Sequence, residues 1–238
     1  METIFYYDAD ILEQFKGLSG GFILGRGMNN LPTPEALKQA YLAEQQSVLE
    51  RIGDTPLSEI ESLAAWRAAF RQFGVNPTKY RSAAEALLRR LTKKGDIPSI
   101  NGLVDICNLV SIRYAIPIAA MDRRAIEGAV RVHFAQGDER FVELDRDEHV
   151  FPERGEVIFT DERKMVVARR WCWRQSDQSA AQVDTSQAVI TIEAQHSRSR
   201  QDVQAACEDL LVLLRRYLGG DFRYDFLDAN KAAFEVDE

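Results

Sequence analysis

Residues 97–126 read IPSINGLVDICNLVSIRYAIPIAAMDRRAI, and this stretch decides how the rest of the chain is interpreted. Its first half predicts a helix that begins near Ser99 and ends before Pro117. Apolar residues recur there at spacings of three and four, which places them on one face: Leu103, Ile106, Val110 and Tyr114. Such a helix buries that face, so the flanking sequence has to supply the elements that cover it.

The sequence before this stretch is typical of helices. Capping residues, apolar spacing and terminal glycines predict helices over about 33–52, 58–73 and 78–95. We therefore expect residues 1–75 to form an N-terminal helical extension packed on the core.

After residue 128 the period of the apolar residues changes to two. The segment 129–134, AVRVHF, alternates apolar and polar residues as a strand does. Further strands are predicted at 140–144, 157–160, 165–174 and 188–194, followed by a helix over about 200–218. Helices, then a mostly antiparallel sheet, then a closing helix predict an α+β fold. Residues 76–220 are the expected main domain and 221–238 a C-terminal tail.

The composition limits the class of protein. A chain of 238 residues forms one large domain, or one domain with an extension. The net charge of −7 argues against a nucleic-acid coat over the whole surface but allows a local basic patch. Three widely spaced cysteines without a CxxC pair indicate reduced thiols rather than disulfides or zinc. We expect a cytoplasmic protein without membrane or DNA partners, and the oligomeric state stays open.

Common catalytic motifs are absent from the sequence. It contains no GxxxxGK, GxSxG or HExxH, and the glycines of GGFILGRG do not follow the dinucleotide-binding order. The three histidines are scattered, without partners at metal-ligand spacing. No cofactor and no metal is therefore predicted.

The segment NPTKYRS, residues 76–82, carries cations in an unusual place. Lys79 and Arg81 fall in the predicted first turn of a helix, where the helix dipole disfavours positive charge. An anion outside the helix would gain from both these side chains and the free N–H groups. The segment supplies five candidate substrate-binding residues: Asn76, Lys79, Tyr80, Arg81 and Ser82. The alternative is a structural joint closed by internal ion pairs.

The segment ARRWCWRQ, residues 168–175, joins two tryptophans to three arginines. On a strand, Arg169, Trp171 and Trp173 would share one face, and Arg170, Cys172 and Arg174 the other. Such a face suits a pocket wall that stacks a base or an apolar side chain, and simple burial in the core is equally compatible. Trp171, Trp173 and Arg174 are therefore candidate binding residues.

The opening stretch resembles the B3/4 domain, the editing and tRNA-binding-like domain in the β chain of bacterial phenylalanyl-tRNA synthetase. The resemblance rests on motifs kept in order and spacing: Ser99-Ile100-Asn101, Leu103-Val104-Asp105, Asn108, Pro117 and Asp122. It continues more weakly to about residue 194. The N-terminal helices and NPTKYRS are similar to freestanding members that lack the synthetase body.

This resemblance implies a three-layer β/β/α fold and a pocket that, in the synthetase, hydrolyses a wrong amino acid from tRNA. The family's acid near the last strand, which helps place the amino group or the water, corresponds to Glu193. A solvent-facing glutamate on an alternating strand is the alternative for that residue. The family's histidine between the proline and the aspartate is replaced in Pro117-Ile118-Ala119-Ala120-Met121-Asp122, and RRWCWRQ stands where the synthetase has a glycine-rich loop.

An aminoacyl ester is already activated, so a pocket that orients it and supplies hydrogen-bond donors can hydrolyse it. Candidate donors are Ser82, Asn101, Asn108 and Thr185. The resemblance predicts a trans-editing hydrolase that binds the charged 3′ end of tRNA. An amino-acid-binding protein that kept the fold without tRNA hydrolysis is the alternative. We expect one concave site to bring together Asn76, Lys79, Arg81, Asn101, Trp171, Trp173 and Arg174.

Overall fold

The computed structural model describes residues 1–143 and 149–237. Within them it forms the following helices: α1 (Ala9–Gln14), α2 (Glu35–Ile52), α3 (Glu61–Gln72), α4 (Ala83–Lys94), α5 (Gly102–Tyr114) and α6 (Ser199–Tyr217). None of the helices in this described part is long and apolar enough to cross a membrane.

The strands of the described residues form two main sheets. The six-stranded sheet has the order β12 (Ala233–Val236), β1 (Glu2–Tyr7), β4 (Val130–Phe134), β7 (Val157–Thr160), β8 (Val166–Arg169) and β9 (Arg174–Gln175). The four-stranded sheet has the order β11 (Asp221–Leu227), β2 (Ser19–Arg26), β10 (Gln187–Ala194) and β3 (Ile118–Asp122). Strands β5 (Phe141–Val142) and β6 (His149–Val150) form a separate short pair.

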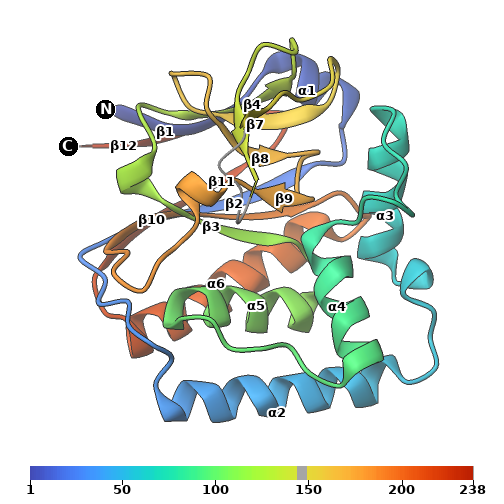
Figure 1. Ribbon diagram of the computed structural model, residues 1–238, viewed down its shortest axis with the longest axis vertical. Helices are drawn as coiled ribbons and strands as arrows, with labels where there is room; N and C mark the ends of the chain where they lie inside the picture. Colours follow the sequence, from blue (N-terminus) through green and yellow to red (C-terminus); the bar gives the residue numbers. More distant parts are fainter. Residues whose placement is uncertain (144–148, 238) are drawn as a thin grey trace.

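The elements stack in three layers, with the six-stranded sheet uppermost, the four-stranded sheet in the middle and helices α2, α4, α5 and α6 below (Figure 1). Strand β10 shows why both faces of the middle sheet are covered. Ile190 and Ile192 pack into the helical layer, whereas Val189 packs into the core between the sheets. Successive side chains of a strand point to opposite faces, so a doubly covered strand is apolar on both. The predicted α+β, three-layer fold is confirmed.

The helix predicted from the opening stretch is present as α5. Asn101 caps it, because its side-chain oxygen accepts a hydrogen bond from the Val104 N–H at 3.0 Å. The helix is buried on most of its surface, since it lies between the middle sheet and α2. The helices predicted over 33–52, 58–73 and 200–218 are also confirmed, within a few residues, as α2, α3 and α6.

The prediction that the next helix begins near Thr78 is wrong. Residues 76–80 form a turn, in which the Asn76 side chain accepts the Thr78 N–H at 2.9 Å. Helix α4 begins only after Ser82, whose hydroxyl accepts the Glu85 N–H at 3.3 Å. Lys79 therefore belongs to a turn and not to a helical first turn.

The expectation of a purely helical N-terminal segment is wrong for residues 2–26. Strand β1 pairs with β4 and β12, and β2 pairs with β10 and β11. Gly20 of GGFILGRG makes room for neighbouring aromatic side chains: a Cβ there would lie 2.5 Å from the Phe22 ring and 2.7 Å from the Tyr7 hydroxyl. Glycine weakens a strand signal, which explains the omission.

The expected C-terminal tail is also partly wrong, because β11 and β12 pair with β2 and β1. The strand at 118–122, β3, was missed as well. The strand predicted over 140–144 is present only as β5, and residue 144 lies outside the described residues.

Candidate functional site

The segment 165–174 is a hairpin and not one strand. Strands β8 and β9 pair with Arg169 opposite Arg174, and a turn joins them. Arg170 and Trp171 have φ angles of +45° and +61°, in the left-handed region that non-glycine residues rarely adopt. The strict alternation predicted for the two tryptophans is therefore wrong: Trp171 is fully buried and Trp173 half-buried.

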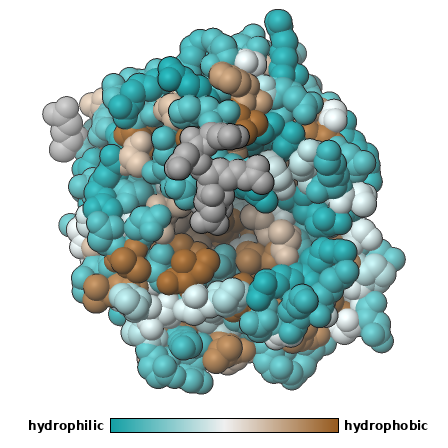
Figure 2. All heavy atoms as spheres, viewed as in Figure 1, coloured by the Kyte–Doolittle hydropathy of each residue, from teal (hydrophilic) through white to brown (hydrophobic). Residues whose placement is uncertain are grey.

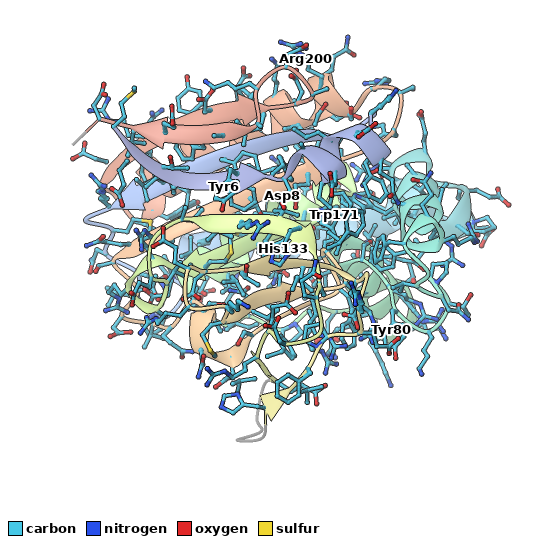
Figure 3. All side chains as sticks on the ribbon, turned by 90° about the horizontal axis from the view of Figure 1, so that it is seen from above. Tyr6, Asp8, Tyr80, His133, Trp171 and Arg200 are labelled. Carbon is cyan, nitrogen blue, oxygen red and sulfur yellow. The ribbon has the colours of Figure 1, made fainter. Side chains whose placement is uncertain are left out.

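Burial of Trp171 offsets the cost of this backbone. Its ring packs edge-on against Phe15 and Trp66, with centroids 4.8 and 5.2 Å away. Its indole N–H donates to Glu193 Oε1 at 3.0 Å. A buried indole requires such a polar partner. Figure 3 shows Trp171 inside the molecule, with Tyr80 nearer the edge.

A cavity of about 560 Å³ lies between this hairpin, α5, β3 and β10. Hydrophobic residues gather around a hollow at the middle of the face shown in Figure 2. The walls are largely apolar and include Val104, Cys107, Ile118, Ala119, Ala120, Phe159 and Ala168. Ile100 and Val183, both exposed, also line it. Its size suits a small ligand such as an amino acid, with a few polar groups to fix orientation.

Glu193 is the single acidic residue among those that line this cavity in the described structure. It is 2% exposed, and its Oε1 accepts both the Trp171 N–H and the Tyr7 hydroxyl, the latter at 2.5 Å. Its Oε2 has no partner among the described residues. The alternative of a solvent-facing glutamate is therefore wrong.

Burial raises the pKa of Glu193 to about 7, against the lowering effect of the hydrogen bonds from Tyr7 and Trp171. Both charge states are therefore populated near neutral pH. The same burial, together with the charge of Glu193, raises the pKa of Tyr7 well above its ordinary value, so its hydroxyl stays a donor. Glu193 can take a proton from water or bind a cationic amino group.

The other reactive groups of the cavity are neutral. Burial raises the pKa of Cys107 to about 12 and that of Cys172 well above its ordinary value, so both thiols are protonated and poor nucleophiles. The Thr191 hydroxyl lies two residues before Glu193 on β10, lines the cavity and has no partner among the described residues. Asn108 lines the cavity from α5.

Aromatic and cationic side chains stack at one side of the cavity. The Arg170 guanidinium lies 3.8 Å from the Tyr80 ring centroid and 4.8 Å from that of Trp173. Arg174 lies 4.7 Å from the Trp173 centroid, and Lys79 Nζ 5.0 Å from that of Tyr80. Trp173 and Arg174 line the cavity directly, while Tyr80 contacts it through Trp173. Such a stack is suited to a nucleobase or a phosphate.

The expected single concave site brings together only part of the predicted set. Residues that line the cavity are Asn101, Asn108, Trp171, Trp173, Arg174 and Glu193. Asn76, Lys79 and Arg81 do not line it, because the turn at 76–80 directs them elsewhere. Arg81 lines a different hollow and lies 3.6 Å from Glu85.

Three of the polar candidates hold the structure together. Ser82 caps α4, and the buried Thr185 hydroxyl donates to Asp122 Oδ2 at 2.7 Å. Asn101 lines the cavity, but its side chain also donates to the Ala181 carbonyl at 3.0 Å while it caps α5. These contacts fix α4, α5 and the loop over 180–185 around the cavity.

Sequence reasoning missed Tyr7 and Thr191. Tyr7 meets Glu193 across 186 positions of sequence, and only the packing of the two sheets against each other brings them together. Thr191 could have been found, since it shares a strand face with Glu193 at a spacing of two.

A sequence model of the B3/4 domain matches residues 65–218. The beta subunit of phenylalanine–tRNA ligase from Shewanella oneidensis is 28% identical over 94 residues, which are 40% of this chain and 12% of that subunit. The corresponding subunit from Aquifex aeolicus is 38% identical over 80 residues, or 34% of this chain and 10% of that one. The chain thus matches only about a tenth of the length of these relatives.

Among solved structures, the chain is similar to an N-terminal fragment of the phenylalanyl-tRNA synthetase beta subunit from Pyrococcus horikoshii. The TM-score is 0.48 at 11% identity, over 92% of this chain and 50% of that one.

Proposed function

This chain belongs to the B3/4 domain family, and we propose that its cavity receives the charged 3′ end of a tRNA and hydrolyses the ester of a wrongly attached amino acid. The proposal rests on one observation. Glu193 is a buried carboxylate that lines an apolar cavity; its Oε1 accepts two hydrogen bonds, whereas its Oε2 has no partner among the described residues. A buried acid without a partner for one oxygen is costly to keep and is a common feature of functional sites.

In the proposed reaction, Glu193 Oε2 accepts a hydrogen bond from a water molecule. It takes a proton from that water as the water oxygen attacks the carbonyl carbon of the ester. The tetrahedral oxyanion accepts a hydrogen bond from the Thr191 hydroxyl. The carbon–oxygen bond to the ribose then breaks, and the protonated Glu193 returns the proton to the ribose oxygen. The products are the free amino acid and uncharged tRNA. A base with a pKa of about 7 is well matched to this proton transfer at neutral pH.

The walls and the aromatic stack have separate roles in this proposal. The apolar walls, which include Ala119 and Ala120, hold the amino-acid side chain. Trp173 stacks the terminal adenine, and Arg174 contacts phosphate in place of its ion pair with Glu143, whose Oε1 lies 2.5 Å from Arg174 Nη1. Because Glu193 and Thr191 supply base and donor, the reaction requires no imidazole.

The test is a deacylation screen against correctly and wrongly charged tRNAs. We expect turnover of at least one mischarged tRNA and a loss of at least about 100-fold in Glu193→Gln. Glu208→Gln, an exposed acid on α6, is the matched control and should retain full activity. Stability of every charged tRNA to the wild-type protein would overturn the proposal. Saturable binding of free amino acids without tRNA binding would instead identify an amino-acid-binding protein.

A further inference from the structure

A second hollow, of about 400 Å³, lies beside α4 and is separate from the cavity. Its walls are α3, α4 and the connection over 53–58. Four cations line it: Arg67, Arg81, Arg89 and Lys93. The two sites meet at the start of α4, where Ala83 lines the cavity and Arg81 lines this hollow.

The charges follow one stripe. Glu85, Arg89 and Lys93 are spaced by four residues, which places them on one face of α4, and Arg81 continues the spacing before its first turn. Between Glu85 and Lys93 the stripe extends over about 12 Å of helix axis. That length exceeds a single phosphate group and suits an extended polyanion.

The acids of this hollow do not neutralise its cations. Glu85 is buried and shared by two arginines, with Arg67 Nη1 at 2.7 Å and Arg81 Nε at 3.6 Å. Arg89 and Lys93 are exposed and have no ion-pair partner among residues 1–143 and 149–237. Asp54 is the other acid of the lining, so two positive charges remain in excess.

Neutral donors complete the lining. Four hydroxyl side chains accompany the cations: Thr55, Ser58, Thr78 and Thr92. Hydroxyls and cations together are the groups that contact phosphate oxygens in nucleic acids. By contrast, acids outnumber cations in the polar hollow on the six-stranded sheet, and Arg131 there donates twice to Asp8, at 2.8 and 2.6 Å.

We propose that this hollow binds the phosphate backbone of the RNA whose charged 3′ end occupies the cavity. The inference rests on the proposed function. In a chain with a net charge of −7, a local excess of cations beside the cavity is where a polyanion gains most. The hollow thus positions the body of the tRNA, while the cavity performs the chemistry.

The test compares Arg89→Ala/Lys93→Ala with a matched control, Arg90→Ala/Lys94→Ala. The control removes the same charge from the same helix, at residues that do not line the hollow. The probe is a fluorescein-labelled tRNA transcript, titrated by anisotropy from 50 to 300 mM KCl. We expect about tenfold weaker binding for the first variant and a salt slope smaller by about 1.5, with little change in the control.

The outcomes separate the two proposals. Unchanged affinity and slope in Arg89→Ala/Lys93→Ala, or an equal loss in the control, overturns this inference and leaves the hydrolase proposal standing. Selective loss of binding in a protein that deacylates no tRNA keeps the RNA site and removes the hydrolase. Absence of tRNA binding by the wild-type protein overturns both. Urea midpoints of both variants should match the wild type, because all four side chains are exposed.

Discussion

Replacing Glu193 by glutamine should make the protein more stable above pH 7. Burial raises the pKa of Glu193 to about 7 in the folded state, from 4.5 as the ordinary value. Between pH 4.5 and pH 7, Glu193 keeps a proton in the folded protein that it has released in the unfolded chain. The contribution of Glu193 to the free energy of unfolding is therefore fully present below pH 4.5 and is lost as the pH rises through 7.

The magnitude follows from the size of the shift. At about 1.4 kcal/mol per pKa unit, a shift of 2.5 units corresponds to about 3 kcal/mol of unfolding free energy lost between pH 4.5 and pH 8.5. Glutamine keeps an oxygen that accepts from Tyr7 and Trp171 but carries no charge. The Glu193→Gln variant should therefore gain up to about 3 kcal/mol over the wild type at pH 8.5.

Urea unfolding of both proteins at pH 5 and pH 8.5 measures this directly. The contributions of titrating groups that do not interact with Glu193 cancel in the difference between variant and wild type, and burial keeps the pKa of both Tyr7 and Cys172, which do interact with it, raised. We expect that difference to grow with pH and the m-value to stay constant. An equal difference at both pH values would refute the reasoning, since Glu193 would then not titrate with a raised pKa.

Three further changes test the residues that line the cavity or support it. Tyr7→Phe removes a hydrogen bond that lowers the pKa of Glu193, so the pH–rate profile of deacylation should move up by about one unit, with roughly fivefold less activity at pH 7. Trp173→Ala should weaken tRNA binding by about 1–3 kcal/mol in anisotropy titrations; it should also lower the urea midpoint, because the ring packs against Tyr80 and Arg170, so binding is compared without denaturant. Asn101→Ala removes a helix cap, the hydrogen bond to the Ala181 carbonyl and one of the two acceptors of the Asn30 amide, which together should cost about 2–3 kcal/mol in urea unfolding; a smaller cost than 1 kcal/mol would contradict the capping role.

Periodicity predicted most of the helical layer, because apolar residues at spacings of three and four occur wherever a helix covers a core. It failed for β2, where glycines give room to neighbouring rings at the expense of strand propensity. It also failed for the hairpin at 166–175. The left-handed backbone of Arg170 and Trp171 is stabilised by burial and by the contact with Glu193, none of which leaves a local signal.

The candidate site, like the fold, contains some features that the sequence reveals and others that it does not. Resemblance and composition pointed to Glu193 and Trp173, and both residues line the cavity; an acid on a late strand and paired tryptophans are visible in the sequence. The hydrogen bond from Tyr7 was not visible, because it depends on two strands of different sheets meeting face to face.

The segment NPTKYRS shows how a local shift divides residues between two sites. Its first five residues form a turn held by Asn76, and the helix starts after Ser82. Tyr80 therefore stacks against Trp173 beside the cavity, whereas Arg81, the next residue, lines the cationic hollow. If the helix had begun at Thr78, the side chains of Tyr80 and Arg81 would point only about 100° apart around the helix axis. The turn places adjacent residues on different surfaces, so the segment forms the boundary between the apolar cavity and the cationic hollow.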